Sequence, residues 1–355
     1  MRHNPFTSAF GLTYPIIQAP MAGGATTPEL VAAVCNAGGM GSFAAAALSP
    51  QAILDGVRRI RALTARPFNV NLFAPRALQA SAGDLTRAHE LLAPFRAELG
   101  LPDPCTPDKF CENPADQIAA LIECRPALAS FTFDVLEADD MACLRRAGLA
   151  VMGTATNVAE ARAWQDAGAD FVCAQGGEAG GHRGTFLGDF DQSCIGLMAL
   201  VPQVVANVRL PVVAAGGIMD GRGIAAAQVL GACAAQLGTA FLCCDESAIS
   251  AAWKRGLRAA GDASTRVTRA FSGRHARGVA NAFMDALRPH EHELPPYPVH
   301  NALTADLRAA AARQDRPEYI SLWAGQGVPM LRALPAARLM QLLVEERAAA
   351  LAQVE

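Results

Sequence analysis

A glycine-rich segment that ends in a histidine is the part of the chain best suited to chemistry. The segment reads Gly176-Gly177-Glu178-Ala179-Gly180-Gly181-His182, and it follows an apolar run at residues 171–174 that predicts a buried strand. Glycines at a strand end let a ligand approach the backbone closely. Histidine is the side chain best suited to moving a proton near neutral pH. The pattern predicts a bound anionic or planar ligand, with His182 beside it as the acid/base group.

Short apolar runs that end in small or polar residues recur eight times, and helical patterns lie between most of them. The runs cover residues 16–19, 41–43, 68–71, 129–133, 149–152, 171–174, 211–214 and 234–237. Helices are predicted over residues 28–36, 49–64 and 157–167, the last with Asn157 as its N-cap and Gly168 at its end. Alternating strands and helices favour a parallel α/β protein, and eight repeats favour a closed (β/α)₈ TIM barrel.

Two stretches interrupt this alternation and set the expected domain boundaries. Residues 74–125 are rich in proline and charge, and residues 245–321 follow the eighth predicted strand. We therefore expect a barrel over residues 1–244 with an excursion at about 74–125. A smaller, mainly helical cap domain over residues 245–321 would be inserted after strand 8. The C-terminal segment, residues 322–355, would pack back on the barrel.

The composition narrows the functional classes. The chain has 355 residues, of which 52% are hydrophobic, and a formal net charge of −3, which argues against a general nucleic-acid binder. Its ten cysteines lack metal-ligand spacing, so we expect reduced thiols, no metal site and a cytoplasmic location. The N-terminus lacks the apolar segment of a signal peptide. The uncharged stretch at residues 223–244 is interpreted as a helix followed by a strand and not as a membrane span.

Glycine-rich loops follow the seventh and eighth predicted strands, at residues 215–223 and 236–240. In barrel enzymes a phosphate often lies between these two loops, held by backbone N–H groups. Gly216, Gly217 and Gly238 permit close backbone approach, and Thr239 can add a hydroxyl donor. The loops therefore predict a phosphate site, which could serve a sugar phosphate or a nucleotide.

Amide side chains lie at other predicted strand ends. Gln18 ends the first strand, just before Met21, while Asn71 ends the third and Gln175 the sixth. Amides in these places suit a ring that bears both donors and acceptors, such as an isoalloxazine. Each amide could instead make only a structural hydrogen bond within its loop.

In these segments the chain resembles the nitronate monooxygenases, formerly called 2-nitropropane dioxygenases, which are FMN-dependent (β/α)₈ enzymes. The matching segments are residues 15–24, 68–73, 175–184, 211–218, 236–241, 272–278 and 322–327. The resemblance implies that His182 is the catalytic histidine. It also implies FMN contacts or near neighbours at Met21, Asn71, Gln175, Gly180, Gly216, Gly217, Gln236, Gly238 and Thr239.

The resemblance further implies a reaction and its partners. An alkyl nitronate would be oxidised by O₂ to a carbonyl compound and nitrite, with no nucleic-acid or membrane partner and with a homodimer left open. His182 would remove the α-proton of a neutral nitroalkane, or as an imidazolium it would pair with the anionic nitronate; the sequence leaves both roles open. Two alternatives remain: a flavin-dependent NAD(P)H reductase of quinones or enoyl thioesters, and a barrel that binds a phosphate ligand without turnover.

Two further residues have alternative interpretations. Asp134 follows the fourth predicted strand, where it would either place a carboxylate at the barrel mouth or, as we favour, cap the next helix. Tyr297 lies in the predicted cap, where it would either line a substrate pocket or serve packing alone.

Overall fold

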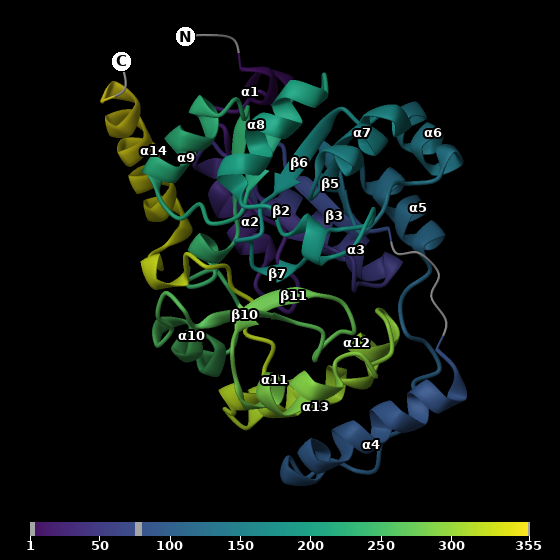
Figure 1. Cartoon of the computed structure of the whole chain (residues 1–355). Helices are drawn as coiled ribbons and strands as arrows, with labels where there is room; N and C mark the ends of the chain where they lie inside the picture. Colours follow the sequence, from purple (N-terminus) through teal and green to yellow (C-terminus); the bar gives the residue numbers. More distant parts are fainter. Residues whose placement is uncertain (1–3, 75–79, 354–355) are drawn as a thin grey trace.

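Eight parallel strands form a barrel at the centre of the computed structural model, which describes residues 4–74 and 80–353 (Figure 1). Residues 75–79, within the predicted excursion, and the terminal residues 1–3 and 354–355 lie outside the described part. The strand order is β1-β9-β8-β6-β5-β4-β3-β2. Hydrogen bonds from Met40 N to Ile16 O and from Gln18 N to Met40 O join β1 to the residues just before β2 and complete the ring.

The predicted (β/α)₈ barrel is confirmed, with all eight strands at the expected places. Their bounds are β1 (Ile16–Gln18), β2 (Ser42–Ala44), β3 (Asn69–Phe73), β4 (Leu128–Thr132), β5 (Ala150–Ala155), β6 (Phe171–Gln175), β8 (Val212–Ala215) and β9 (Ala234–Leu237). Parallel strands that are covered on both faces read as apolar runs, which explains why the sequence showed them clearly.

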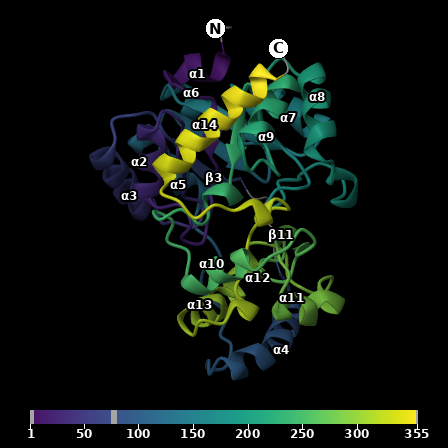
Figure 2. The same ribbon diagram turned by 90° about the vertical axis from the view of Figure 1, so that its left-hand side faces the viewer.

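A ring of helices surrounds the strands. It consists of α2 (Pro28–Asn36), α3 (Pro50–Leu63), α5 (Pro114–Cys124), α6 (Ala138–Arg146), α7 (Val158–Ala167), α8 (Leu197–Asn207), α9 (Gly221–Val229) and α14 (Ala336–Ala352). As predicted, Asn157 caps α7 by accepting from Glu160 N, and Gly168 ends it at φ 86°. Figure 2 shows α14 crossing between α2 and α9, both of which it contacts, so the last helix of the chain closes the ring.

The stretch at residues 223–244 forms most of α9 followed by β9, as interpreted from the sequence. Within residues 4–74 and 80–353, no helix is long and apolar enough to cross a membrane. The chain also contains short 3₁₀ turns: η1 (Asp191–Ser193), η2 (Thr239–Phe241), η3 (Arg288–His290), η4 (Pro317–Tyr319) and η5 (Val328–Met330).

A second layer covers the carboxyl end of the barrel strands, at the bottom of Figure 1. It contains α10 (Ala251–Arg258), β10 (Thr265–Thr268), β11 (Ala276–Val279), α11 (Ala282–Leu287), α12 (Val299–Leu303) and α13 (Ala305–Arg313). Helix α4 (Ala82–Glu98), from the stretch between β3 and β4, shares the hydrophobic core of this layer through Leu92. Arg96 of α4 pairs with Asp306 of α13 at 2.9 Å. The position of the domain boundaries stays a prediction.

The opposite end of the barrel is closed by the short helix α1 (Pro5–Phe10). Phe6 is fully buried, and its ring lies 5.2 Å from that of Phe171 at the start of β6. Asn4 donates from Nδ2 to Cys233 O at 2.7 Å. The N-terminal segment therefore plugs the barrel bottom, which leaves the carboxyl end for a ligand.

Candidate functional site

His182 lies on a two-residue strand, β7 (Gly181–His182), and not on a free loop as the glycine-rich sequence suggested. β7 pairs antiparallel with β11, opposite Ala276, and β11 in turn pairs with β10. Gln175, at the end of β6, donates from Nε2 to His182 O at 3.0 Å. The histidine is thus held between the barrel and the covering layer.

Four aromatic rings from four parts of the chain surround the imidazole; we call Phe73, Phe133, Tyr297 and Trp323 the aromatic wall. Their ring centroids lie 6.1, 5.6, 5.8 and 5.6 Å from that of His182. Phe73 ends β3 and Phe133 follows β4, whereas the other two come from the covering layer and the C-terminal segment. Such a wall shields the imidazole from water on several sides.

Phe133 has a backbone φ of 97°, a conformation that L residues other than glycine seldom adopt. The guanidinium of Arg274 lies over its ring at 4.0 Å from the centroid. Asp134 is not the N-cap of the next helix, so the favoured interpretation was wrong: Glu137 holds that position, and Asp134 Oδ1 accepts from Val135 N. The negative charge of Asp134 acts on Arg274 at the barrel mouth.

The charged side chains that act on His182 are positive. Burial, followed by the positive charges of Arg274 and Arg308, lowers the pKa of His182 to about 3. Burial lowers the pKa of each arginine only to about 10, so both stay cationic at neutral pH. Burial raises the pKa of Tyr297, which keeps that phenol neutral. A neutral imidazole therefore lies in a positive environment.

Within residues 4–74 and 80–353, neither Arg274 nor Arg308 forms an ion pair with a carboxylate. Arg274 donates to the carbonyls of Arg183, at 3.2 Å, and Thr185. Arg308 donates to Asn301 O at 2.8 Å. Two half-buried cations whose hydrogen-bond acceptors are carbonyl oxygens favour the approach of an anion.

The predicted phosphate loops meet at one side of the barrel mouth. The N–H groups of Gly180, Gly217, Gly238 and Thr239 donate to no other described residue. A Cβ built on Gly325 would lie 3.1 Å from Gly180 N and 3.4 Å from Thr239 Oγ1, so this turn of the C-terminal segment connects the β6 and β9 loops. Gly216 and Gly217 have φ values of 122° and 69°, which glycine adopts without strain. Free N–H groups on such loops suit a phosphate.

The other predicted site residues divide into two groups. Gln175, Ala215 and Gln236 lie in register on neighbouring strands β6, β8 and β9, and a Cβ on Gly238 would lie 3.7 Å from Met21 Sδ. Gln236 Oε1 is buried and has no partner among the described residues, so it can accept from a ligand. Asn71, on β3, instead donates to Ser130 O and Oγ at 3.1 Å.

The family model for nitronate monooxygenase matches residues 4–346. The chain belongs to the nitronate monooxygenase family. A nitronate monooxygenase of Pseudomonas aeruginosa is 44% identical over 346 residues, covering 96% of this chain and 98% of the relative. The nitroalkane oxidase of Streptomyces ansochromogenes has a matching crystal structure, with a TM-score of 0.91, 44% identity and 99% of both chains covered.

Membership of this family makes the chain an oxidoreductase and implies a flavin cofactor. The enoyl reductase domain of MlnA from Bacillus amyloliquefaciens is also similar, with a TM-score of 0.68, 14% identity and coverage of 99% of this chain and 98% of that one. At that identity the likeness shows the fold alone. The residues of the barrel mouth fit a phosphate-bearing flavin: the unbonded N–H groups suit a phosphate, and the unpaired amide oxygen of Gln236 suits a donor on the ring.

Sequence reasoning did not assign several residues that the structure brings to the site. Ser272 hydrogen-bonds His182 at 2.8 Å, Arg274 and Arg308 supply charge, and Trp323 and Gly325 come from the C-terminal segment. Ser272, Arg274, Trp323 and Gly325 fall in the matching segments 272–278 and 322–327, which was the available signal for them.

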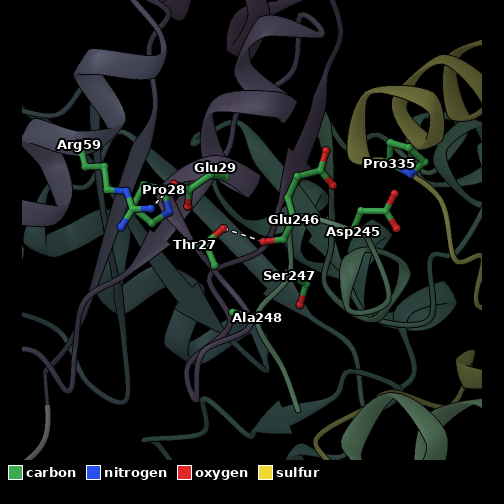
Figure 3. A pocket seen from close by; sticks show the side chains of 9 residues that line it. All are labelled: Thr27, Pro28, Glu29, Arg59, Asp245, Glu246, Ser247, Ala248 and Pro335. Atoms are coloured by element: carbon green, nitrogen blue, oxygen red, sulfur yellow. Dashed lines mark hydrogen bonds and ion pairs between the residues drawn. The ribbon is translucent and has the colours of Figure 1, made fainter. Parts of the chain in front are cut away.

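A separate pocket of about 700 Å³ lies between α2, the turn after β9 and the start of α14 (Figure 3). It contains none of the predicted site residues. Arg59 pairs there with Glu29, and Glu246 accepts from Ala336 N at 2.9 Å, so these groups serve to fix α14 and α3 to the barrel.

Proposed function

We propose that this chain is an FMN-dependent enzyme that oxidises alkyl nitronates with O₂, giving a carbonyl compound and nitrite. The observation that carries this proposal is the placement of a neutral His182 beside two cationic arginines at the mouth of the barrel. A nitronate is an anion, so Arg274 and Arg308 would attract it electrostatically without help from an imidazolium.

The free N–H groups of Gly180, Gly217, Gly238 and Thr239 would hold the phosphate of FMN. Gln236 would accept from the flavin ring through its unpaired Oε1, while Met21 and Gly216 would lie close to the cofactor. FMN, when bound, supplies the acceptor for the electrons of the nitronate. Asn71 and Gln175 are proposed as further contacts, since each lies on a barrel strand near its carboxyl end.

His182 would act as a base toward a neutral nitroalkane. With a pKa of about 3 the imidazole is unprotonated at neutral pH, so its lone pair can accept the α-proton. The same low pKa makes it a weaker base than an unshifted histidine. The C–H bond breaks, its electron pair stays with the substrate as the nitronate, and the proton moves to the ring. The aromatic wall keeps water away from the anion so formed.

The test starts from the purified protein. We expect a flavin absorption spectrum and, after denaturation, release of FMN identified by its mass. Under anaerobic conditions, propionate 3-nitronate should bleach the flavin faster than NADH does. Fast bleaching by NADH alone would instead support the reductase, and a colourless protein that stays colourless with added FMN would support a phosphate-binding barrel.

The phosphate site has a matched pair of variants. Gly217→Ala places a Cβ at φ 69°, 3.3 Å from Glu178 Cβ, and should weaken FMN retention. Gly148→Ala has a similar φ of 75° but open surroundings far from the mouth, so it controls for backbone strain. Equal FMN retention in the two variants would contradict the assignment of the 216–217 loop.

A further inference from the structure

Building on the proposed function, we infer that Ser272 is a positioning residue that keeps the proton of His182 on Nε2, so that Nδ1 is the atom that receives the substrate proton. Ser272 would not touch the substrate. It acts through the imidazole, and the two ring nitrogens of His182 thereby acquire different roles.

The hydrogen-bond directions around Ser272 lead to this assignment. Ser272 Oγ lies 2.8 Å from His182 Nε2 and donates to Arg274 O at 3.1 Å. A hydroxyl has one hydrogen, so Oγ must accept from the imidazole if it donates to the carbonyl. Nε2 therefore carries the proton of the neutral ring, and Nδ1 carries the lone pair.

The turn that contains Ser272 keeps this direction fixed. If the hydroxyl donated to Nε2 instead, Arg274 O would have no donor among the described residues. Ser272 is 1% exposed, so bulk water does not compete for its hydroxyl, and the bond to Arg274 O is costly to give up. Gly273 holds the turn at φ 75°, where a Cβ would lie 2.0 Å from Pro295 O. The serine oxygen is thus set in place by backbone geometry.

The other nitrogen is open. His182 Nδ1 makes no hydrogen bond to the described residues, 4–74 and 80–353. It is also not enclosed by protein atoms, so a substrate can reach it. The charged or titratable groups that act on the imidazole are Arg274, Arg308 and Tyr297, all from the covering layer. The two arginines oppose protonation in the resting state, so Nδ1 presents a lone pair to the barrel mouth.

Ser272 also acts while the proton moves. When Nδ1 takes the substrate proton the ring becomes an imidazolium, and the Nε2–H···Oγ hydrogen bond becomes charge-assisted and stronger. This bond offsets part of the repulsion from the nearby arginines. Ser272 should therefore matter for proton removal from a nitroalkane and not for oxidation of a nitronate that arrives already deprotonated.

The first test reads the tautomer directly. In ¹⁵N-histidine-labelled holoenzyme at neutral pH, the His182 resonances are assigned by their loss in His182→Asn. We expect a protonated Nε2 and an unprotonated Nδ1. The opposite tautomer would overturn the inference, whatever the substrate of the enzyme proves to be.

The second test separates the two substrates. Ser272→Ala should lower kcat/KM for nitroethane about 10-fold to 100-fold, because a hydrogen bond to a developing charge is lost. Oxidation of ethyl nitronate should stay within about twofold of wild type, since it needs no base. Ser272→Thr, which keeps the hydroxyl, should recover most of the nitroethane activity.

Ser247→Ala is the matched control. Ser247 is a buried serine whose Oγ has no partner among the described residues, so its removal should leave both substrates unaffected. Equal losses on both substrates in Ser272→Ala, or no loss on either, would overturn the positioning role. If the wild-type enzyme oxidises neither substrate, the proposed function fails, while the tautomer measurement still decides the state of His182.

Discussion

The pH dependence of nitroalkane oxidation should reveal how far the site shifts its histidine. An exposed histidine with a pKa of about 6.5 would be about 3% neutral at pH 5, so base-dependent turnover would fall about 30-fold between pH 8 and pH 5. Burial and the two arginines lower the pKa of His182 to about 3. About 99% of the imidazole then stays neutral at pH 5, and kcat/KM for nitroethane should be flat from pH 8 to pH 5.

The assay is oxygen consumption after addition of freshly dissolved neutral nitroethane, which converts slowly to its nitronate in water. Ethyl nitronate, prepared separately, serves as the base-independent control over the same pH range. The flavin spectrum at each pH confirms that the holoenzyme remains intact. A fall of about 30-fold toward pH 5 with nitroethane, without a similar fall with the nitronate, would refute the electrostatic reasoning.

Three predictions concern stability. His300 is fully buried, and burial lowers its pKa to about 4, whereas in the unfolded chain the same group binds its proton near pH 6.5. The free energy of unfolding should therefore fall by about 3 kcal/mol from this group as the pH drops from 6.5 to 4. A series of urea-unfolding measurements that shows no change over this range would contradict the prediction. Phe6→Ala should lower the free energy of unfolding by about 3–5 kcal/mol, because it leaves a cavity where α1 closes the bottom of the barrel. FMN retention should be unchanged in the folded protein. An unchanged Tm would show that α1 is dispensable. Glu160→Ala should cost about 3 kcal/mol or more, because Thr156 N, Phe186 N and Leu187 N lose their acceptor. Calorimetry measures the difference from Glu29→Ala, which removes a half-exposed carboxylate and its ion pair with Arg59.

The barrel could be predicted from the sequence because its rules are local. Each strand is an apolar run of a few residues followed by glycine or a polar side chain, and a helix such as α7 carries its own cap and stop at Asn157 and Gly168. His182 and the glycine loops stand at strand ends, where barrel active sites lie. Local pattern and tertiary position therefore agree for these parts.

The rest of the site depends on contacts across long separations. Ser272 lies ninety positions from His182, and their hydrogen bond forms only because β11 pairs with β7. Phe133 follows β4 at a φ that local preference would exclude for phenylalanine. Asp134 looked like an N-cap because it precedes a helix, but the turn extends to Glu137 before α6 begins. Chain docking, and not residue type, determines these positions.

The pairing of β7 with β11 has a consequence for protein engineering. Cap segments are attractive modules to exchange between relatives when a new substrate preference is wanted. Here the strand that carries His182 belongs to the same small sheet as β10 and β11. A graft of residues 265–279 alone would therefore pair a β11 from another protein with the original β7, which carries His182. A chimaera that retains activity must transfer residues 181–182 together with that hairpin as one inherited unit.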